Sequence, residues 1–125
     1  MGAPVRARWL IGVLALGIAA SCASAQKAAI PDQRATVLKN WALSRCLAHA
    51  FEGDPAGQDA AVSAAAYLEQ GDSPIEAYED LEKLAKSFAA KPYNGSVPGE
   101  YKTMKCIDLY VSPDLNAAIE KALAR

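Results

Sequence analysis

The chain is organised around residues 93–110, which read YNGSVPGEYKTMKCIDLY. The pairs Asn-Gly at 94–95 and Pro-Gly at 98–99 are strong turn formers, so the first half of the stretch predicts a tightly turned loop. The second half predicts a short amphipathic helix around Cys106, and a loop presented on such a helix is a scaffold suited to recognition. The side chains at helical spacing are Tyr101, Met104, Ile107 or Cys106, and Tyr110.

The N-terminus has the three parts of a secretory signal peptide. Two arginines precede an apolar run at residues 9–20, and Ala-Ser-Ala at 23–25 fits a signal-peptidase site. We expect residues 1–25 to be removed, which leaves 100 of the 125 residues as one mature domain, 26–125. No second apolar segment is long enough to cross a bilayer, which takes about 20 residues, so we expect an exported, soluble product.

The same segment has an alternative interpretation. Residues 19–22, Ala-Ala-Ser-Cys, are similar to a bacterial lipoprotein box, in which Cys22 would become lipidated and N-terminal after cleavage. The usual leucine three positions before the cysteine is missing, and the Ala-Ser-Ala site fits ordinary cleavage well, so plain secretion is favoured. The alternative function is therefore an exported lipoprotein that acts as an envelope scaffold or interaction module.

The cysteines predict one disulfide under either interpretation. Cys22 is discarded or acylated, which leaves Cys46 and Cys106 as a pair. Exported proteins fold in an oxidising compartment, where an even number of cysteines indicates disulfide bonding. We expect Cys46 and Cys106 to be joined.

Charge is unevenly distributed along the mature chain. It carries 11 basic and 14 acidic residues, and the interval 46–82 contains nine of the acidic residues and no lysine or arginine. We therefore expect a surface of one sign. Such a surface argues against nucleic acid as a partner, because phosphate binding needs clustered Lys and Arg, and it favours a basic protein surface.

Apolar periodicity predicts an all-α fold, a small bundle of about five helices with mostly antiparallel connections. The first helix is expected at about 33–51, after a polar lead at 26–32, with Trp41 as its heaviest anchor. The second is the alanine-rich segment at about 55–70. Three further helices are expected: one opened by a capping box at Ser73-Pro74-Ile75-Glu76 and stopped by Pro92, the Cys106 helix, and a last helix capped by Ser112-Pro113-Asp114.

The residues of the common catalytic and metal sites are not assembled in this sequence. His49 follows Cys46 by three residues, but Cys46 is assigned to the disulfide and no orienting Asp or Asn stands out, so a nucleophilic pair is disfavoured. Two cysteines and one histidine at these spacings do not form a tetrahedral zinc site. No phosphate loop, nucleophile elbow or dinucleotide fingerprint occurs. We expect a binding protein without enzymatic activity or cofactor.

Four segments resemble, in order and spacing, the family-four immunity proteins of type VI secretion amidase effectors. They are LKNWALSRC at 38–46, SAAAYLEQG at 63–71, PIEAYE at 74–79 and GSVPGEYKTMKCIDLY at 95–110. The similarity spans nearly all of the mature chain, and the last segment is the most specific. Tyr101-Lys102 stands where the family pattern has Phe-Asn, a departure that bears on affinity or partner choice.

The resemblance implies a periplasmic, all-α, dimeric protein that performs no chemistry itself. Its expected partner is a peptidoglycan amidase effector with a papain-like Cys-His active site, which cuts the bond between γ-D-glutamate and diaminopimelate. The expected mode of inhibition is occlusion of the active-site cleft.

Two surfaces are candidates for that contact. A turned loop can enter a cleft, and Tyr and Asn combine contact area with adaptable hydrogen bonds; the alternative is that the loop only turns the chain. The acidic start of the third helix could steer a basic rim. The residues are Tyr93, Asn94, Ser96 and Val97 in the loop, and Glu76, Glu79 and Asp80 at the helix start.

Overall fold

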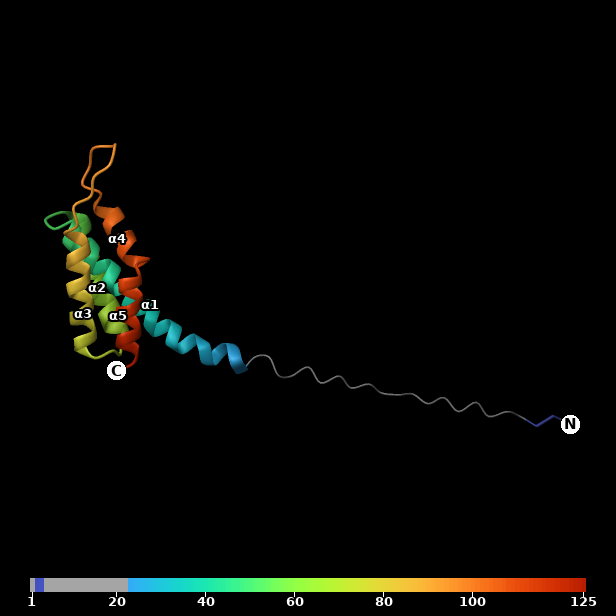
Figure 1. The fold of residues 1–125 in the computed structure, drawn as a ribbon. Helices are drawn as coiled ribbons and strands as arrows, with labels where there is room; N and C mark the ends of the chain where they lie inside the picture. Colours follow the sequence, from blue (N-terminus) through green and yellow to red (C-terminus); the bar gives the residue numbers. More distant parts are fainter. Residues whose placement is uncertain (1, 4–22) are drawn as a thin grey trace.

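The computed structural model describes residues 2–3 and 23–125, and within them the chain forms five α-helices and no strand (Figure 1). The all-α prediction is confirmed. Most of the predicted signal peptide, including Cys22, lies outside the described residues. No helix in the described part of the chain is long and apolar enough to cross a membrane. The helices are α1 (Ala23–Ala50), α2 (Pro55–Gln70), α3 (Ile75–Ala89), α4 (Lys102–Tyr110) and α5 (Pro113–Leu123).

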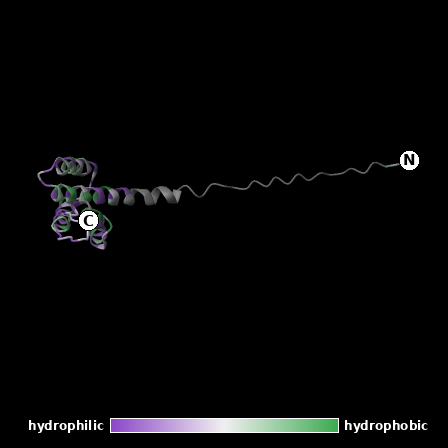
Figure 2. Ribbon diagram, turned by 90° about the horizontal axis from the view of Figure 1, so that it is seen from above, coloured by the Kyte–Doolittle hydropathy of each residue, from purple (hydrophilic) through white to green (hydrophobic). Residues whose placement is uncertain are grey.

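The long helix α1 is the centre of the bundle. It contacts each of the other four helices, whereas α2 contacts only α1 among the helices described. Seen from above, α2 lies on one side of α1 and the remaining helices lie on the other (Figure 2). The chain runs up α1, down α2 and up α3, and then descends through α4 and α5, which follow one another in the same direction (Figure 1).

The first helix starts earlier than predicted, at Ala23 instead of near Gln33. The expected polar lead at 26–32 is therefore wrong. Periodicity detects a helix by the face that it buries, and this segment has no apolar stripe to detect.

The starts of α2 and α5 follow the cap chemistry, whereas α3 and α4 have no side-chain cap. Asp54 Oδ1 accepts a hydrogen bond of 3.0 Å from the Ala56 amide ahead of α2, and Ser112 Oγ accepts one of 3.1 Å from Leu115 ahead of α5. The predicted cap at Ser73 is wrong, because α3 begins at Ile75 with Pro74 at the capping position and no side-chain cap. Pro74 has extended backbone angles there, which leaves Ser73 one position too far from the free amides.

The core lies between α1 and the helices α3 to α5. Trp41 is buried on α1 as predicted, and its ring meets that of Tyr78 edge to face, with 5.1 Å between the centroids. The disulfide Cys46–Cys106 joins α1 to α4 with an S–S distance of 2.10 Å, which confirms the predicted pairing. The fully buried larger side chains are Leu38, Leu81, Leu109, Leu115 and the two cysteines.

The buried face of α4 differs from the predicted stripe. Cys106 and Leu109 face the core, whereas Met104 and Ile107 are about half exposed. The disulfide fixes the rotation of this short helix, because Cys106 must point at Cys46 on α1. Ile107, one position after Cys106, and Met104, two positions before it, are thereby turned toward solvent.

Candidate functional site

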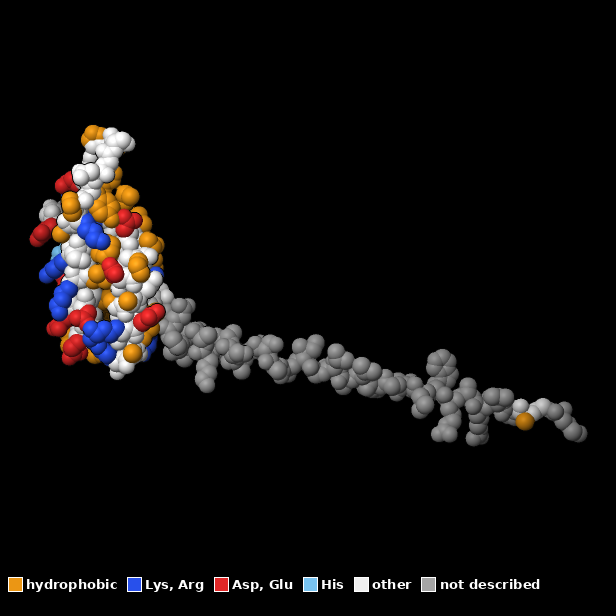
Figure 3. All heavy atoms as spheres, viewed as in Figure 1, with side chains coloured by type: hydrophobic (Ala, Val, Ile, Leu, Met, Phe, Trp, Pro, Cys, Tyr) orange, Lys and Arg blue, Asp and Glu red, His pale blue; other side chains and the backbone are white. Residues whose placement is uncertain are grey.

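The connection between α3 and α4 protrudes from one end of the bundle (Figure 1). Residues 94–100 are all exposed, and Val97 keeps 68% of its accessible surface. Residues 93–99 carry no charge, and the tip appears as uncharged atoms with a hydrophobic cap in Figure 3. The structure therefore places Asn94, Ser96 and Val97, three of the four predicted loop residues, where a partner can reach them.

Tyr93, the fourth predicted loop residue, lies at the base of the loop and is partly buried. Its hydroxyl donates a hydrogen bond of 2.5 Å to Asp108 Oδ2 on α4, and Lys105 Nζ lies 6.0 Å from the centre of its ring. The hydrogen bond to the Asp108 carboxylate raises the pKa of Tyr93. Tyr93 therefore anchors the start of the loop to α4, and its hydroxyl is engaged in the hydrogen bond to Asp108.

Tyr101 braces the loop from the other side. It has φ 55°, the left-handed region that L residues rarely adopt, and is the one non-glycine residue among those described with a positive φ. This conformation turns its ring back into the loop, where the hydroxyl donates to the Val97 carbonyl. A Cβ on Gly95 would meet that hydroxyl, so a larger residue there would displace the Tyr101 side chain. The loop is built around the Tyr101 side chain.

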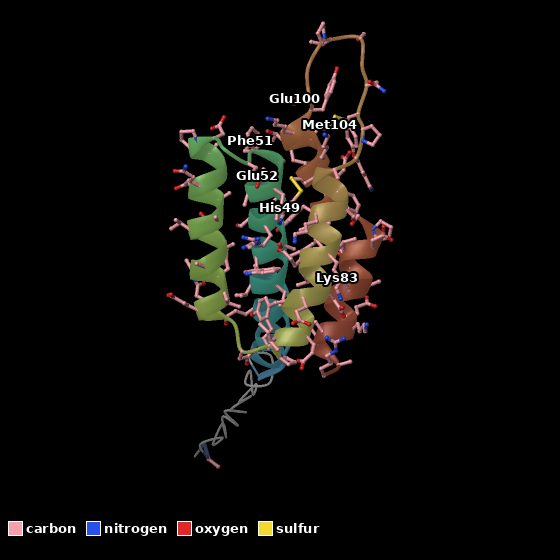
Figure 4. All side chains as sticks on the ribbon, turned by 90° about the vertical axis from the view of Figure 1, so that its left-hand side faces the viewer. His49, Phe51, Glu52, Lys83, Glu100 and Met104 are labelled. Atoms are coloured by element: carbon pink, nitrogen blue, oxygen red, sulfur yellow. A yellow bond between two sulfur atoms is a disulfide. The ribbon has the colours of Figure 1, made fainter. Side chains whose placement is uncertain are left out.

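The start of α4, beneath the loop, is also held by contacts of Lys102. Lys102 Nζ lies 3.0 Å from the Glu100 carboxylate and 5.5 Å from the centre of the Phe51 ring. Figure 4 shows Phe51, Glu100 and Met104 grouped at this end of the bundle. Tyr101 and Lys102, the two positions at which the sequence departs from the family pattern, thus both contact the loop or its base.

The acidic start of α3 lies at the opposite end of the bundle from the loop (Figure 1). Glu76 and Glu79 are exposed. Asp80 is engaged by α5 and the C-terminus: its carboxylate lies 3.0 Å from Arg125 Nη2 and 3.3 Å from Lys121 Nζ. Hydrogen bonds from Arg125 and then Lys121 lower the pKa of Asp80. Of the three predicted acidic residues, only Glu76 and Glu79 present unpaired carboxylates within the described part of the chain.

The expected surface of one sign is interrupted at three of its nine acidic residues, Asp72, Asp80 and Glu82, which are paired with cations. Glu82 receives two hydrogen bonds from Arg45, of 2.7 and 2.8 Å, and its carboxylate lies 2.7 Å from His49 Nε2. The Arg45 hydrogen bonds lower the pKa of Glu82 to about 2, against the opposing effect of burial. Asp72 pairs with Arg34 at 2.9 Å. Cations distant in the sequence therefore fold back onto the acidic interval, which sequence spacing could not show.

This arrangement leaves no nucleophilic pair around His49. The sulfur of Cys46 is in the disulfide, and the imidazole is held against Glu82. Within residues 2–3 and 23–125, no group of three or more His, Cys, Asp or Glu side chains is positioned to hold a metal ion.

A groove of about 550 Å³ runs between α2 and α3. Trp41 and Tyr78 form its floor, and Leu68 of α2 and Ile75 of α3 are partly exposed along it. Sequence spacing does not reveal this groove, because Ile75 lies three residues before the buried Tyr78 and helical spacing would place both on the same face. The Ile75 side chain is 60% exposed, since α2 and α3 do not contact each other.

The described part of the chain is a small all-α domain with one disulfide and an exposed loop between α3 and α4. Residues 36–119 match the family model of the type VI secretion system (T6SS) amidase immunity proteins, Tai4. The chain belongs to the Tai4 family of amidase immunity proteins. No curated protein matches it significantly.

Solved structures of two bacterial systems are similar to this chain. A chain of the effector–immunity system Tae4/Tai4 from Salmonella typhimurium is 39% identical, with 74% of this chain and 93% of that chain covered and a TM-score of 0.67. A chain of the Tae4–Tai4 complex from Enterobacter cloacae is 27% identical, with 69% and 88% covered and a TM-score of 0.61. A chain of the complex of Salmonella typhimurium Tae4 with Enterobacter cloacae Tai4 is 27% identical. The match covers 69% of this chain and 89% of that chain, with a TM-score of 0.61.

Proposed function

We propose that this chain binds a type VI secreted peptidoglycan amidase in the periplasm and blocks its active-site cleft, without catalysing a reaction itself. Membership of an amidase immunity family and likeness to structures of Tae4 with Tai4 support the partner class. The proposed effector is a papain-like amidase with a Cys-His active site, and the proposed immunity protein acts as a dimer.

The observation that carries the mode of inhibition is the loop. It is uncharged, exposed at Asn94, Ser96 and Val97, and held from both sides by Tyr93 and Tyr101. A loop that is ordered before binding loses little conformational entropy on entering a cleft, which favours affinity. We infer that the loop tip fills the cleft and that Tyr93 positions it, while its ring remains available at the rim.

The acidic end of α3 has a different proposed role. Because it lies at the far end of the bundle, one protomer cannot place both surfaces in the same cleft (Figure 1). Exposed charges outside the contact area act over longer distances and mainly accelerate association. We infer that Glu76 and Glu79 steer a basic effector surface, with Asp80 restrained by α5.

The test is co-purification of residues 26–125 with a Tae4-type amidase, followed by digestion of cell-wall sacculi with and without the chain. We expect a stable complex that abolishes cleavage. Val97→Asp should weaken inhibition by at least about tenfold, because it brings a charge into a desolvated contact. Val62→Asp on α2 is the matched control, since Val62 is 69% exposed and far from the loop in sequence. Equal inhibition by both variants would remove the loop from the site.

Export is tested separately by mass spectrometry of the chain recovered from the periplasm. An N-terminus at Gln26 is expected from the Ala-Ser-Ala site. Fractionation with membranes and an acylated Cys22 would instead favour the envelope scaffold.

A further inference from the structure

Asn94 and Gly95 form the one Asn-Gly pair in the chain and lie at the start of the protruding loop (Figure 1). Both residues are exposed, and neither belongs to a helix. An asparagine side chain can be attacked by the backbone nitrogen of the next residue. Glycine favours this reaction, because it has no Cβ to crowd that nitrogen and its backbone rotates freely. The pair is therefore a candidate for spontaneous deamidation.

The contacts that hold the loop leave this pair free to react. The side-chain hydrogen bonds of the loop are made by Tyr93 at its base and by Tyr101 at its end. In the part of the chain that the structure describes, no hydrogen bond engages the Asn94 side chain or the Gly95 backbone nitrogen. The two groups can therefore meet without giving up an existing contact.

The asparagines on the helices are held instead. Asn40 lies in α1 and Asn116 in α5, where the next backbone amide donates to a carbonyl of the preceding turn. Asn40 Oδ1 also accepts a hydrogen bond of 3.4 Å from the Tyr110 hydroxyl. The next residues are Trp41 and Ala117, whose Cβ atoms crowd the nitrogen that would attack. Asn40 and Asn116 are thus internal controls for the loop asparagine.

We propose that Asn94 is a site of spontaneous deamidation, which makes the uncharged loop acidic as the protein ages. The Gly95 nitrogen loses its proton and bonds to Asn94 Cγ, while the bond from Cγ to Nδ2 breaks and the side-chain nitrogen leaves with a proton as ammonia. Water then opens the resulting succinimide. Opening at Cγ gives aspartate, and opening at the main-chain carbonyl gives isoaspartate. The reaction consumes water and needs no oxidant or reductant.

Either product changes the loop that the proposed function places in the amidase cleft, so the effect on inhibition rests on that function. Both carry a carboxylate, whereas residues 93–99 have no charge of their own. Isoaspartate also lengthens the main chain before Gly95, which displaces Gly95 from the Tyr101 hydroxyl beside it. A charge is costly in a desolvated contact unless it is paired, so the deamidated loop should bind more weakly. The free protein would then lose inhibitory capacity with age.

The test is incubation of the chain recovered from cells at pH 7 and 37 °C, followed over time by peptide mass mapping. Asn94 should convert at least about tenfold faster than Asn40 or Asn116, because those two positions must also give up a helical hydrogen bond. The converted chain, isolated by ion exchange, should bind a Tae4-type amidase at least about tenfold more weakly than the fresh chain.

Three variants separate the causes of that loss. Asn94→Asp supplies the carboxylate without incubation and should weaken binding when fresh. Asn116→Asp adds the same charge at an exposed position of α5, outside the loop, and should bind as tightly as the wild type. Asn94→Gln has a longer side chain that closes the ring much more slowly, so its affinity should be the same before and after incubation.

The outcomes distinguish this proposal from the proposed function. Conversion at Asn94 no faster than at Asn40 or Asn116 would overturn the site, and an inhibitory fresh chain would leave the immunity function standing. Conversion without weaker amidase binding, or an equal loss when Asn94→Gln is incubated, would overturn the effect on inhibition. If the fresh wild-type chain binds no Tae4-type amidase, the immunity function fails, and the mass measurement still decides whether Asn94 reacts.

Discussion

Removal of the Cys46–Cys106 disulfide is expected to lower the free energy of unfolding by about 4 kcal/mol. The bond joins α1 to α4 across a sequence separation of 60 residues. In the chain-entropy relation, closing a loop of this length restricts the unfolded chain by that amount at 25 °C. A mature domain of this size has a net stability of about 5 to 15 kcal/mol, so the reduced protein should be only marginally folded.

The assay is thermal and urea unfolding of the oxidised protein and of the same protein in a phosphine reductant, followed by circular dichroism. For a domain of this size the loss corresponds to a fall in Tm on the order of 20 °C. The double variant Cys46→Ala/Cys106→Ala should fall at least as far, because it also leaves cavities at two fully buried positions. A reduced protein whose Tm lies within about 5 °C of the oxidised one would refute the chain-entropy argument.

Three further predictions follow from single contacts. Glu82→Gln should cost about 2 kcal/mol at pH 7, because Arg45 loses its charged partner. Since the pKa of Glu82 falls from 4.5 to about 2, this stabilisation is full above pH 4.5 and is lost toward pH 2, so pH-dependent urea unfolding of wild type and variant should converge in acid. Gly57→Ala should destabilise by about 1 to 3 kcal/mol in thermal unfolding, because its Cβ would lie 2.1 Å from a backbone carbonyl at the end of α1, whereas Gly99→Ala meets nothing and should be neutral. Tyr101→Phe removes only the hydroxyl that holds the Val97 carbonyl, so the effector off-rate should rise by about fivefold; an unchanged off-rate would contradict the brace.

Features set by local chemistry could be predicted from the sequence. The bounds of α2 follow from Asp54-Pro55 at its start and Gly71 at its end, and they match the structure. The disulfide follows from the cysteine count and the export signal. The protruding loop follows from its turn-forming pairs. Each of these depends on residues that are adjacent in the sequence or on a choice between very few partners.

Features set by packing could not be predicted. The rotation of α4 depends on where Cys46 lies on α1, so the choice between Cys106 and Ile107 as the buried position needed the three-dimensional pairing. The neutralisation of Glu82 depends on Arg45, which is 37 residues away and carries no sequence signal of the contact. A run of like charge along the chain thus does not establish a surface of like charge.

The contacts of residues 93–110 also explain why stability and binding should be coupled in this protein. The disulfide holds Cys106 to α1, and two residues further on Asp108 accepts the hydrogen bond that anchors Tyr93 at the loop base. Tyr101, at the start of the same helix, holds the loop tip through Val97. Because both braces depend on α4 being docked, loss of the disulfide should loosen the loop before the bundle unfolds. Cleavage of the reduced protein by an added protease should therefore accelerate first within residues 93–101, and an unchanged cleavage rate there while α4 exchanges freely would contradict this coupling.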